Sequence, residues 1–308
     1  MEIEKSIERS IMTKKKKNKK WLQLTYKILT ILGCLMICYP FVSQIYYQYV
    51  TMQETKQFDD EKGKLADQDV EKRIELAKAY NSTLSPEKIG DPFSSRKKEE
   101  GVAEYARMLQ LQEKIGYVTI PSINQKIPIR AGSSENVLQN GAGHLEWTSL
   151  PVGGVSTHTV ITAHRGLPTA RLFTDLDKVK VGDVFYITNI KETLAYQVDK
   201  ILTVEPTDFK PILVKEGEDR ATLLTCTPYM INSHRLLVQG KRIPFREAEK
   251  KNKTKIDFFA QYKWFILLAA GLILLLLGYL LFKMLRKKGK ETSLSWKRKN
   301  NYLGWVSC

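Results

Sequence analysis

Two long uncharged apolar runs constrain this chain more than any other feature of its sequence. Residues 28–47 (ILTILGCLMICYPFVSQIYY) and 264–282 (WFILLAAGLILLLLGYLLF) contain no charged side chain. At about 1.5 Å per residue, a helix of either length reaches across the roughly 30 Å hydrocarbon layer of a bilayer. The alternatives are two buried core helices, or a cleaved signal peptide for the first run. No clear A-x-A cleavage site follows that run, so we expect it to remain as an anchor.

The positive charge of the chain gathers in the two tails beside these runs. The chain has 49 Lys and Arg against 33 Asp and Glu, a formal net charge of +16. Residues 1–27 account for +6 of this charge and residues 283–308 for +7, which leaves +3 for everything between them. Basic clusters beside membrane spans mark cytoplasmic ends. We therefore expect a two-pass cell-membrane protein with both termini inside, residues 48–263 outside, and no nucleic-acid partner.

The external region changes its periodicity near residue 116. Residues 51–79 are charge-rich with scattered apolar positions, which predicts a helical stalk that residues 81–86 end, and residues 99–114 are predicted to be helical again. Eight short β-rich runs follow, most of them separated by Gly, Pro, Asn or Asp. They are 116–120, 127–130, 144–147, 157–163, 184–188, 194–204, 221–225 and 236–241. This pattern favours a β-sandwich or a closed barrel, because closure removes exposed edges. The long connection at residues 204–219 is a candidate binding loop.

One cysteine stands alone in the external region. Cys34 and Cys38 lie in the first apolar run and Cys308 is the last residue, which leaves Cys226. In a secreted domain without a disulfide framework, a single unpaired cysteine is a candidate reactive thiol. Cys226 comes at the end of a predicted strand, where we expect a thiol to be more exposed than in mid-strand.

Two further residues at strand ends complete a candidate catalytic set with Cys226. His164 ends one β-rich run, and Arg235 begins the run after the cysteine. A nucleophilic thiol needs a proton donor or acceptor and a positive group that stabilises thiolate and oxyanion. An inert buried thiol and a structural histidine are the plainer interpretations. A zinc site of Cys226, His164 and His234 lacks paired ligand spacing.

These residues resemble the motifs of a known family. Residues 222–226 (TLLTC) match the TLxTC motif of sortases, the membrane-anchored cysteine transpeptidases of Gram-positive bacteria, and His164 and Arg235 stand where their histidine and arginine do. Longer strings resemble class C sortases, the pilin polymerases. They are HL at 144–145, TSLPVGG at 148–154, AHRGLP at 163–168, LF at 172–173, CTPY at 226–229 and NSHRLLV at 232–238. The similarity covers roughly residues 75–245.

The resemblance implies a mainly β fold, an eight-stranded sortase β-barrel with an N-terminal helical and lid segment, flanked by two transmembrane helices. The expected organisation is a cytoplasmic basic tail (1–27), a transmembrane helix (28–47), an extracellular helical stalk and lid (48–110), the barrel (111–246), a linker (247–263), a second transmembrane helix (264–282) and a second cytoplasmic basic tail (283–308). The second span is itself a class C feature.

The resemblance also implies a mechanism. The Cys226 thiolate would attack the Thr–Gly bond of an LPxTG-like sorting signal, and His164 would protonate the leaving amine. A lysine of another pilin subunit would resolve the thioacyl enzyme into an isopeptide bond, while Arg235 would hold the substrate backbone and the oxyanion. We expect Thr225 and Ala163, which precede the cysteine and the histidine, to contribute to substrate binding. No metal or organic cofactor is required; several class A and B relatives use calcium, but no acidic cluster here supports it.

A lid is the third implication. The tripeptide Asp91-Pro92-Phe93 resembles the active-site lid of class C sortases. Asp91 can pair with Arg235, Phe93 can cover the Cys226 sulfur, and Pro92 stiffens the segment between them. An ordinary Asp-Pro turn is the alternative.

Three functional hypotheses follow. The first is a pilin-polymerising sortase whose partners are LPxTG-bearing pilin subunits. The second is a sortase that attaches single surface proteins to a cell-wall precursor, and it differs only in the second nucleophile. The third is a catalytically silent membrane scaffold for secreted proteins, against which the complete Cys, His and Arg set counts.

Overall fold

The computed structural model describes residues 2–84, 104–251, 267–268 and 271–272. The chain divides into two compact units, Met1–Lys255 and Ile256–Cys308, and nearly all described residues belong to the first. Most of the expected second span lies outside the described residues, so that span stays a prediction.

A single N-terminal helix contains the first apolar run. This helix, α1 (Glu2–Lys62), is the one helix among the described residues that is long and apolar enough to cross a bilayer. Its large apolar side chains between Ile28 and Val42 are exposed, as a lipid-facing surface would be. The stalk predicted at residues 51–79 is not one separate helix, because α1 runs unbroken from the apolar run into it and ends at Lys62. After a short connection at residues 63–66, a second helix, α2 (Asp67–Ser82), forms the rest of the stalk.

The C-terminal part of α1 packs on the first two strands of the sheet. Phe58 is 1% exposed and meets the Tyr117 ring edge-on, with ring centroids 6.0 Å apart. Glu54 pairs with Arg130 over 2.8 Å. This packing explains why the helix continues past the apolar run. The burial of Phe58 stabilises the charge-rich C-terminal part of α1, which would be marginally stable as an isolated helix.

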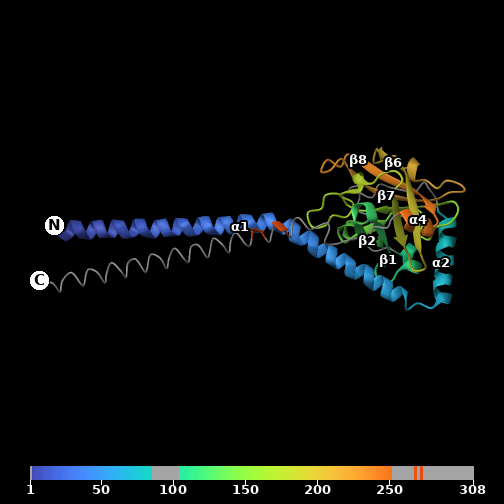
Figure 1. Cartoon of the computed structure of the whole chain (residues 1–308), viewed down its shortest axis with the longest axis horizontal. Coiled ribbons are helices and arrows are strands. Elements are labelled where there is room, and N and C mark those ends of the chain that lie inside the picture. Colours follow the sequence, from blue (N-terminus) through green and yellow to red (C-terminus); the bar gives the residue numbers. More distant parts are fainter. Residues whose placement is uncertain (1, 85–103, 252–266, 269–270, 273–308) are drawn as a thin grey trace. The chain divides into compact units, whose positions relative to one another are not determined.

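Within the described residues, eight strands close into one barrel. Their order around it is β1-β2-β3-β4-β7-β8-β6-β5. Figure 1 labels β1, β2, β6, β7 and β8 of this barrel. The strands are β1 (Lys114–Ile120), β2 (Gln125–Ala131), β3 (Ala142–His144), β4 (Thr157–Thr162), β5 (Val184–Thr188), β6 (Thr193–Val204), β7 (Asp219–Thr227) and β8 (His234–Ile243). Neighbours are antiparallel except for the β2–β3 and β4–β7 pairs, which are parallel. The eight-stranded barrel is confirmed, and the sandwich alternative is wrong.

Two local predictions differ from the structure. Residues 99–114 were predicted to be helical, but the described part is a 3₁₀ turn, Glu104–Leu109, followed by β1 from Lys114. The run at 144–147 was predicted to be a strand, but β3 ends at His144. Trp147 has a φ of 67°, a left-handed conformation outside the β region.

Alternate residues from the strands fill the barrel interior. Leu223 of β7, Ile161 of β4 and Val238 of β8 belong to one buried cluster with residues from the other strands. The interior is closely packed: a Cβ at Gly240 would lie 2.8 Å from the Phe185 ring. Only glycine therefore lets β8 pass this ring.

A smaller apolar cluster lies on the opposite face of β4, β7 and β8. This outer cluster consists of Leu145, Val160, Ile212, Leu224 and Leu237. Ile212 comes from the long connection between β6 and β7, whose 3₁₀ turn Lys210–Ile212 packs against the strands together with Phe209. The predicted long connection is present, and part of it covers the outside of the barrel.

Candidate active site

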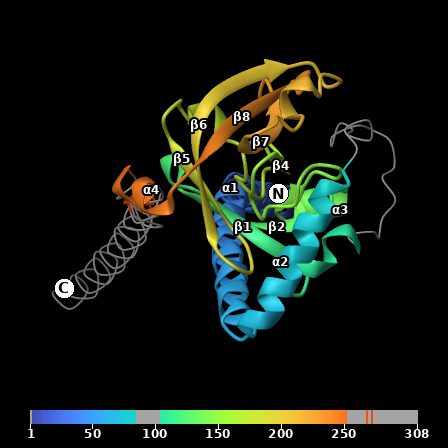
Figure 2. The same cartoon turned by 90° about the vertical axis from the view of Figure 1, so that its right-hand side faces the viewer.

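Two of the three residues selected from the sequence lie on neighbouring strands, and His164 follows the end of a third strand by two residues. Strand β7 lies between β4 and β8, parallel to the first and antiparallel to the second (Figure 2). In the β7–β8 ladder, Cys226 is the direct partner of Arg235. Directly opposed residues of an antiparallel pair project from the same face, with Cβ atoms about 4.5–5.5 Å apart. The cysteine and arginine side chains therefore start side by side.

His164 reaches the same place through the parallel ladder between β4 and β7. Partners in this ladder differ by 62 in residue number. The same offset continues past the end of β4, where the Thr225 hydroxyl donates to the Ala163 carbonyl over 2.7 Å. One residue further along, this register sets His164 beside Cys226. The histidine, the cysteine and the arginine thus form a row across three strands.

The row lies on the outer face of the barrel. Successive side chains of a strand alternate between faces. Cys226 follows the β7 leucine of the outer cluster by two residues, and Arg235 precedes the β8 leucine of that cluster by two. Val160 belongs to the same cluster, and the same alternation along β4 brings His164 to this face. The outer cluster therefore lies on the same face as the cysteine, the histidine and the arginine.

Cys226 and Arg235 are both buried. Cys226 is 6% exposed and Arg235 7%, while the His164 side chain is 18% exposed. Nη1 of Arg235 donates to the carbonyls of Asn232 and His234, each over 3.0 Å. At 6% exposed, Cys226 is slightly more exposed than Leu223 and Leu224 in mid-strand, as expected, although it is still buried.

The two residues predicted to help bind substrate join the strands in this structure. Thr225 and Ala163 are both fully buried, and the hydrogen bond between them links β7 to β4. Neither side chain reaches the surface. Their substrate-binding role stays a prediction.

A carboxylate that the sequence analysis missed lies beside the histidine. Oε1 of Glu135, the first residue of α3 (Glu135–Gln139), is 3.3 Å from Nε2 of His164. Glu135 is 70% exposed, so its charge is well hydrated. A carboxylate in this position orients an imidazole ring. No motif spacing could reveal the pair, because 29 residues separate its members.

The two buried histidines have structural roles. His144 donates from Nε2 to the Ser149 carbonyl, which can only accept, and its Nδ1 therefore accepts from the Tyr105 hydroxyl; both contacts measure 2.9 Å. His158 likewise contacts a carbonyl of the β6–β7 connection and a β7 hydroxyl. Burial lowers the pKa of each histidine to about 4. Both are neutral near pH 7 and lie away from the row that contains His164.

Acidification is expected to destabilise the fold through these two histidines. Between about pH 6.5 and pH 4 the unfolded chain protonates both imidazoles while the folded chain does not, so the free energy of unfolding falls as the pH falls. The loss approaches about 3 kcal/mol per histidine at pH 4. Denaturant titration of the full chain in detergent from pH 7.5 to 4.5 measures it. His158→Gln should halve the pH slope, and a flat or inverted profile would contradict the assignment.

The fourth histidine does not support a metal site. His234 pairs with Thr227 in the β7–β8 ladder, and its Nε2 lies 3.1 Å from Oε1 of Glu205. The described part of the chain holds no group of three or more His, Cys, Asp or Glu placed to bind a metal ion.

The lid residues Asp91, Pro92 and Phe93 lie outside the described residues, so the lid stays a prediction.

The family model for the sortase domain matches residues 118–243, which span most of the barrel and all three residues of the row. Solved structures of similar proteins extend this likeness. The chain resembles Sortase C of Streptococcus pneumoniae, 61% identical with a TM-score of 0.60, over 62% of this chain and 97% of that one. A pilus-related Sortase C of Group B Streptococcus is 56% identical with a TM-score of 0.60, over 62% of this chain and 98% of that one.

The chain is less similar to the curated Sortase A proteins. Sortase A of Bacillus anthracis is 27% identical over 132 residues, which are 43% of this chain and 61% of that protein. The match thus spans less than two thirds of this relative's length. Identity to the Sortase C structures is about twice as high, over nearly the whole length of the solved chains.

Proposed function

The chain belongs to the sortase family, where it stands with the class C members, and from that we propose that it is a membrane-anchored cysteine transpeptidase that assembles pili. One observation carries the proposal. The β7–β8 register pairs Cys226 with Arg235, and the β4–β7 register, continued past Thr162 by the Thr225–Ala163 bond, supports His164 as their neighbour. A nucleophile, a proton carrier and a fixed cation are the groups that acyl transfer through a thioester needs.

The first half of the reaction follows from these three groups. The Cys226 sulfur attacks the threonine carbonyl carbon of an LPxTG-like signal, and the carbonyl oxygen becomes an oxyanion beside the Arg235 guanidinium. The C–N bond to glycine then breaks, and the His164 imidazolium gives its proton to the leaving amine. The products are a thioester on Cys226, a free glycine amine and a neutral imidazole.

The second half reverses the proton flow. A lysine amine of another pilin subunit attacks the thioester carbonyl, His164 accepts a proton from this amine, and the Cys226 thiolate leaves. The product is an isopeptide bond, and the enzyme returns to its starting protonation state. Neither half consumes an oxidant, a reductant or a nucleotide.

The comparisons favour a lysine acceptor over a cell-wall acceptor. The similar structures at 55–63% identity are sortases C: the one from Streptococcus pneumoniae is described for its pilin substrate specificity, and those from Group B Streptococcus are pilus-related or belong to a pilus island. Sortase A relatives are 24–29% identical. Attachment of single proteins to the cell wall is the second candidate. It would use the same thioester with a different amine.

Membrane anchoring through α1 fits the same function. The helix continues from its apolar segment to the surface of β1 and β2, where Phe58 is buried. This continuity would keep the barrel close to the outer leaflet, where membrane-bound pilin precursors present their sorting signals. Both termini inside and a second span at residues 264–282 complete the proposed topology.

Trapping the thioester tests the proposal. The full chain in detergent is mixed with an LPxTG-containing peptide, and the Cys226 peptide is examined by mass spectrometry. We expect an adduct with the mass of the peptide up to threonine. Adding a lysine-bearing pilin peptide should discharge it to an isopeptide product, whereas discharge only by a cell-wall peptide amine would support the second candidate. An alkylatable Cys226 that forms no adduct with any sorting peptide would overturn the enzymatic function.

A further inference from the structure

The residue after the candidate histidine has three polar partners beside the site. Arg165 begins the loop that follows β4, and its side chain is 7% exposed. Nη1 donates to the Thr227 hydroxyl over 2.9 Å, and Nε donates to the Thr174 carbonyl over 3.2 Å. Nη2 pairs with Oδ2 of Asp177 over 2.7 Å. A buried guanidinium with three separate partners fixes all of them relative to one another.

These contacts bracket the candidate catalytic pair. Thr227 is the residue directly after Cys226, as Arg165 is the residue directly after His164. The Arg165–Thr227 bond therefore has the same offset of 62 as the Thr225–Ala163 bond on the other side. The two side-chain bonds extend the parallel register beyond β4, with His164 and Cys226 between them.

The arginine also ties this end of the strands to the core. Asp177 lies in the 3₁₀ turn Leu176–Lys178, and Leu176 is fully buried in the main core cluster. Thr174, which accepts from Nε, directly follows the buried Phe173. The guanidinium thus connects the loop after β4 to a segment that the core holds in place.

The residue after Arg165, Gly166, brings the loop after β4 close to the turn after β7. Gly166 has a φ of +92°, and a Cβ there would lie 3.0 Å from the Tyr229 ring. Tyr229 follows Thr227 by two residues and is 49% exposed. The loop after β4 and the turn after β7 therefore fit tightly together, and a change at Arg165 cannot be absorbed by slack between them.

We propose that Arg165 is a positioning residue that sets the distance between His164 and Cys226 by holding Thr227. Its guanidinium contacts Thr227, Thr174 and Asp177, and it acts on Cys226 through the adjacent Thr227. The inference rests on the proposed function for its kinetic effect, while its structural content, the coupling of His164 to Cys226, stands independently of any sorting signal.

Substitution of Arg165 is expected to lower kcat with little change in KM. Arg165→Lys keeps a positive charge for Asp177, but one ammonium cannot also reach Thr227 and Thr174 in a fixed plane. We expect kcat for an LPxTG peptide to fall about 10- to 100-fold, the effect of a misplacement near 1 Å, and KM to change less than about twofold. Thr227→Val keeps the strand-favouring shape and removes only the hydroxyl, so it should lower kcat in the same direction.

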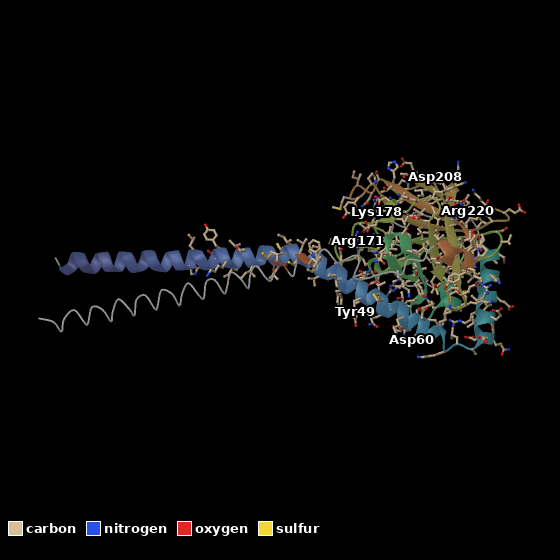
Figure 3. The ribbon with its side chains drawn as sticks, in the orientation of Figure 1. Tyr49, Asp60, Arg171, Lys178, Asp208 and Arg220 are labelled. Carbon is tan, nitrogen blue, oxygen red and sulfur yellow. The ribbon has the colours of Figure 1, made fainter. Side chains whose placement is uncertain are left out.

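The pair of variants and a matched control separate positioning from general stability. Combining Arg165→Lys with Thr227→Val should lower kcat no further than Arg165→Lys alone, because both remove one bond. Arg171→Gln is the control: Arg171, labelled with Lys178 in Figure 3, lies in the same loop, and its hydrogen bonds and ion pair go to Asp175. It should leave kcat within about twofold of the parent value. Additive losses, or an equal loss in the control, would contradict the proposal.

Alkylation of Cys226 decides the case without any sorting peptide. Iodoacetamide rates are measured on the full chain in detergent, for the parent and for His164→Ala, each with and without Arg165→Lys. If Arg165 places the histidine, His164→Ala should change the rate in the parent but by less than about twofold in the Arg165→Lys chain. An undiminished His164 effect there would overturn the positioning role. A parent that alkylates but forms no thioester would overturn the proposed function and leave the Arg165 result standing.

Discussion

Replacing Cys226 with alanine is expected to abolish peptide cleavage and pilin joining together, with a loss of at least about 10³-fold in kcat, because no other group can form the thioester. The fold should persist, since the change removes one sulfur atom from a residue at the end of β7 and leaves a small cavity. Mass-spectrometric detection of the acyl adduct, together with thermal unfolding of the full chain in detergent, measures both effects.

The chain supplies its own cysteine control for this result. Cys34 and Cys38 lie exposed on α1. Their replacement by alanine should leave cleavage and joining unchanged. Turnover in the Cys226→Ala chain, or a comparable loss on replacing the α1 cysteines, would show that the nucleophile is wrongly assigned.

Replacing Arg235 with lysine is expected to lower kcat/KM about 10²-fold or more although the charge is kept. Nη1 of Arg235 is already committed to the Asn232 and His234 carbonyls, so contact with a developing oxyanion needs the other donors of the same planar group. A lysine has a single nitrogen and cannot hold the turn and the oxyanion at once. Steady-state cleavage of an LPxTG peptide measures the loss.

A second arginine on the same strand is the matched control. Arg242 lies near the other end of β8, 3.6 Å from Glu192, away from Cys226. Arg242→Lys should keep kcat/KM within about twofold. Near-normal turnover in Arg235→Lys would mean that Arg235 acts only as a point charge, and a loss in both variants would point to the stability of β8 instead.

Local patterns were enough to locate the strands and to select the reactive groups. Alternation of apolar and polar residues is a property of a few neighbouring positions, so β5 matches its predicted run at both ends, and β6 and β8 differ from theirs by one or two residues. Cys226 was singled out by composition, because it is the one external cysteine. The resemblance to sortases added the barrel and the identity of the histidine.

Long-range contacts account for what the sequence analysis missed. The extent of α1 depends on Phe58, whose ring partner Tyr117 lies 59 residues away in the chain. The carboxylate beside His164 belongs to Glu135, which lies 29 residues away in the chain. Neither partner leaves a signal in the residues around the position that it controls.

The sequence by itself determined the apolar span, the strand positions and the thiol, because each of these depends on residues close together in the chain. Only the tertiary structure decided that β7 would lie between β4 and β8, and in which register. A shift of one residue in either ladder would turn a side chain of the row to the other face of the sheet. The register that prevents this is set by packing on both faces of the strands and by the Thr225–Ala163 and Arg165–Thr227 bonds, each between residues 62 apart.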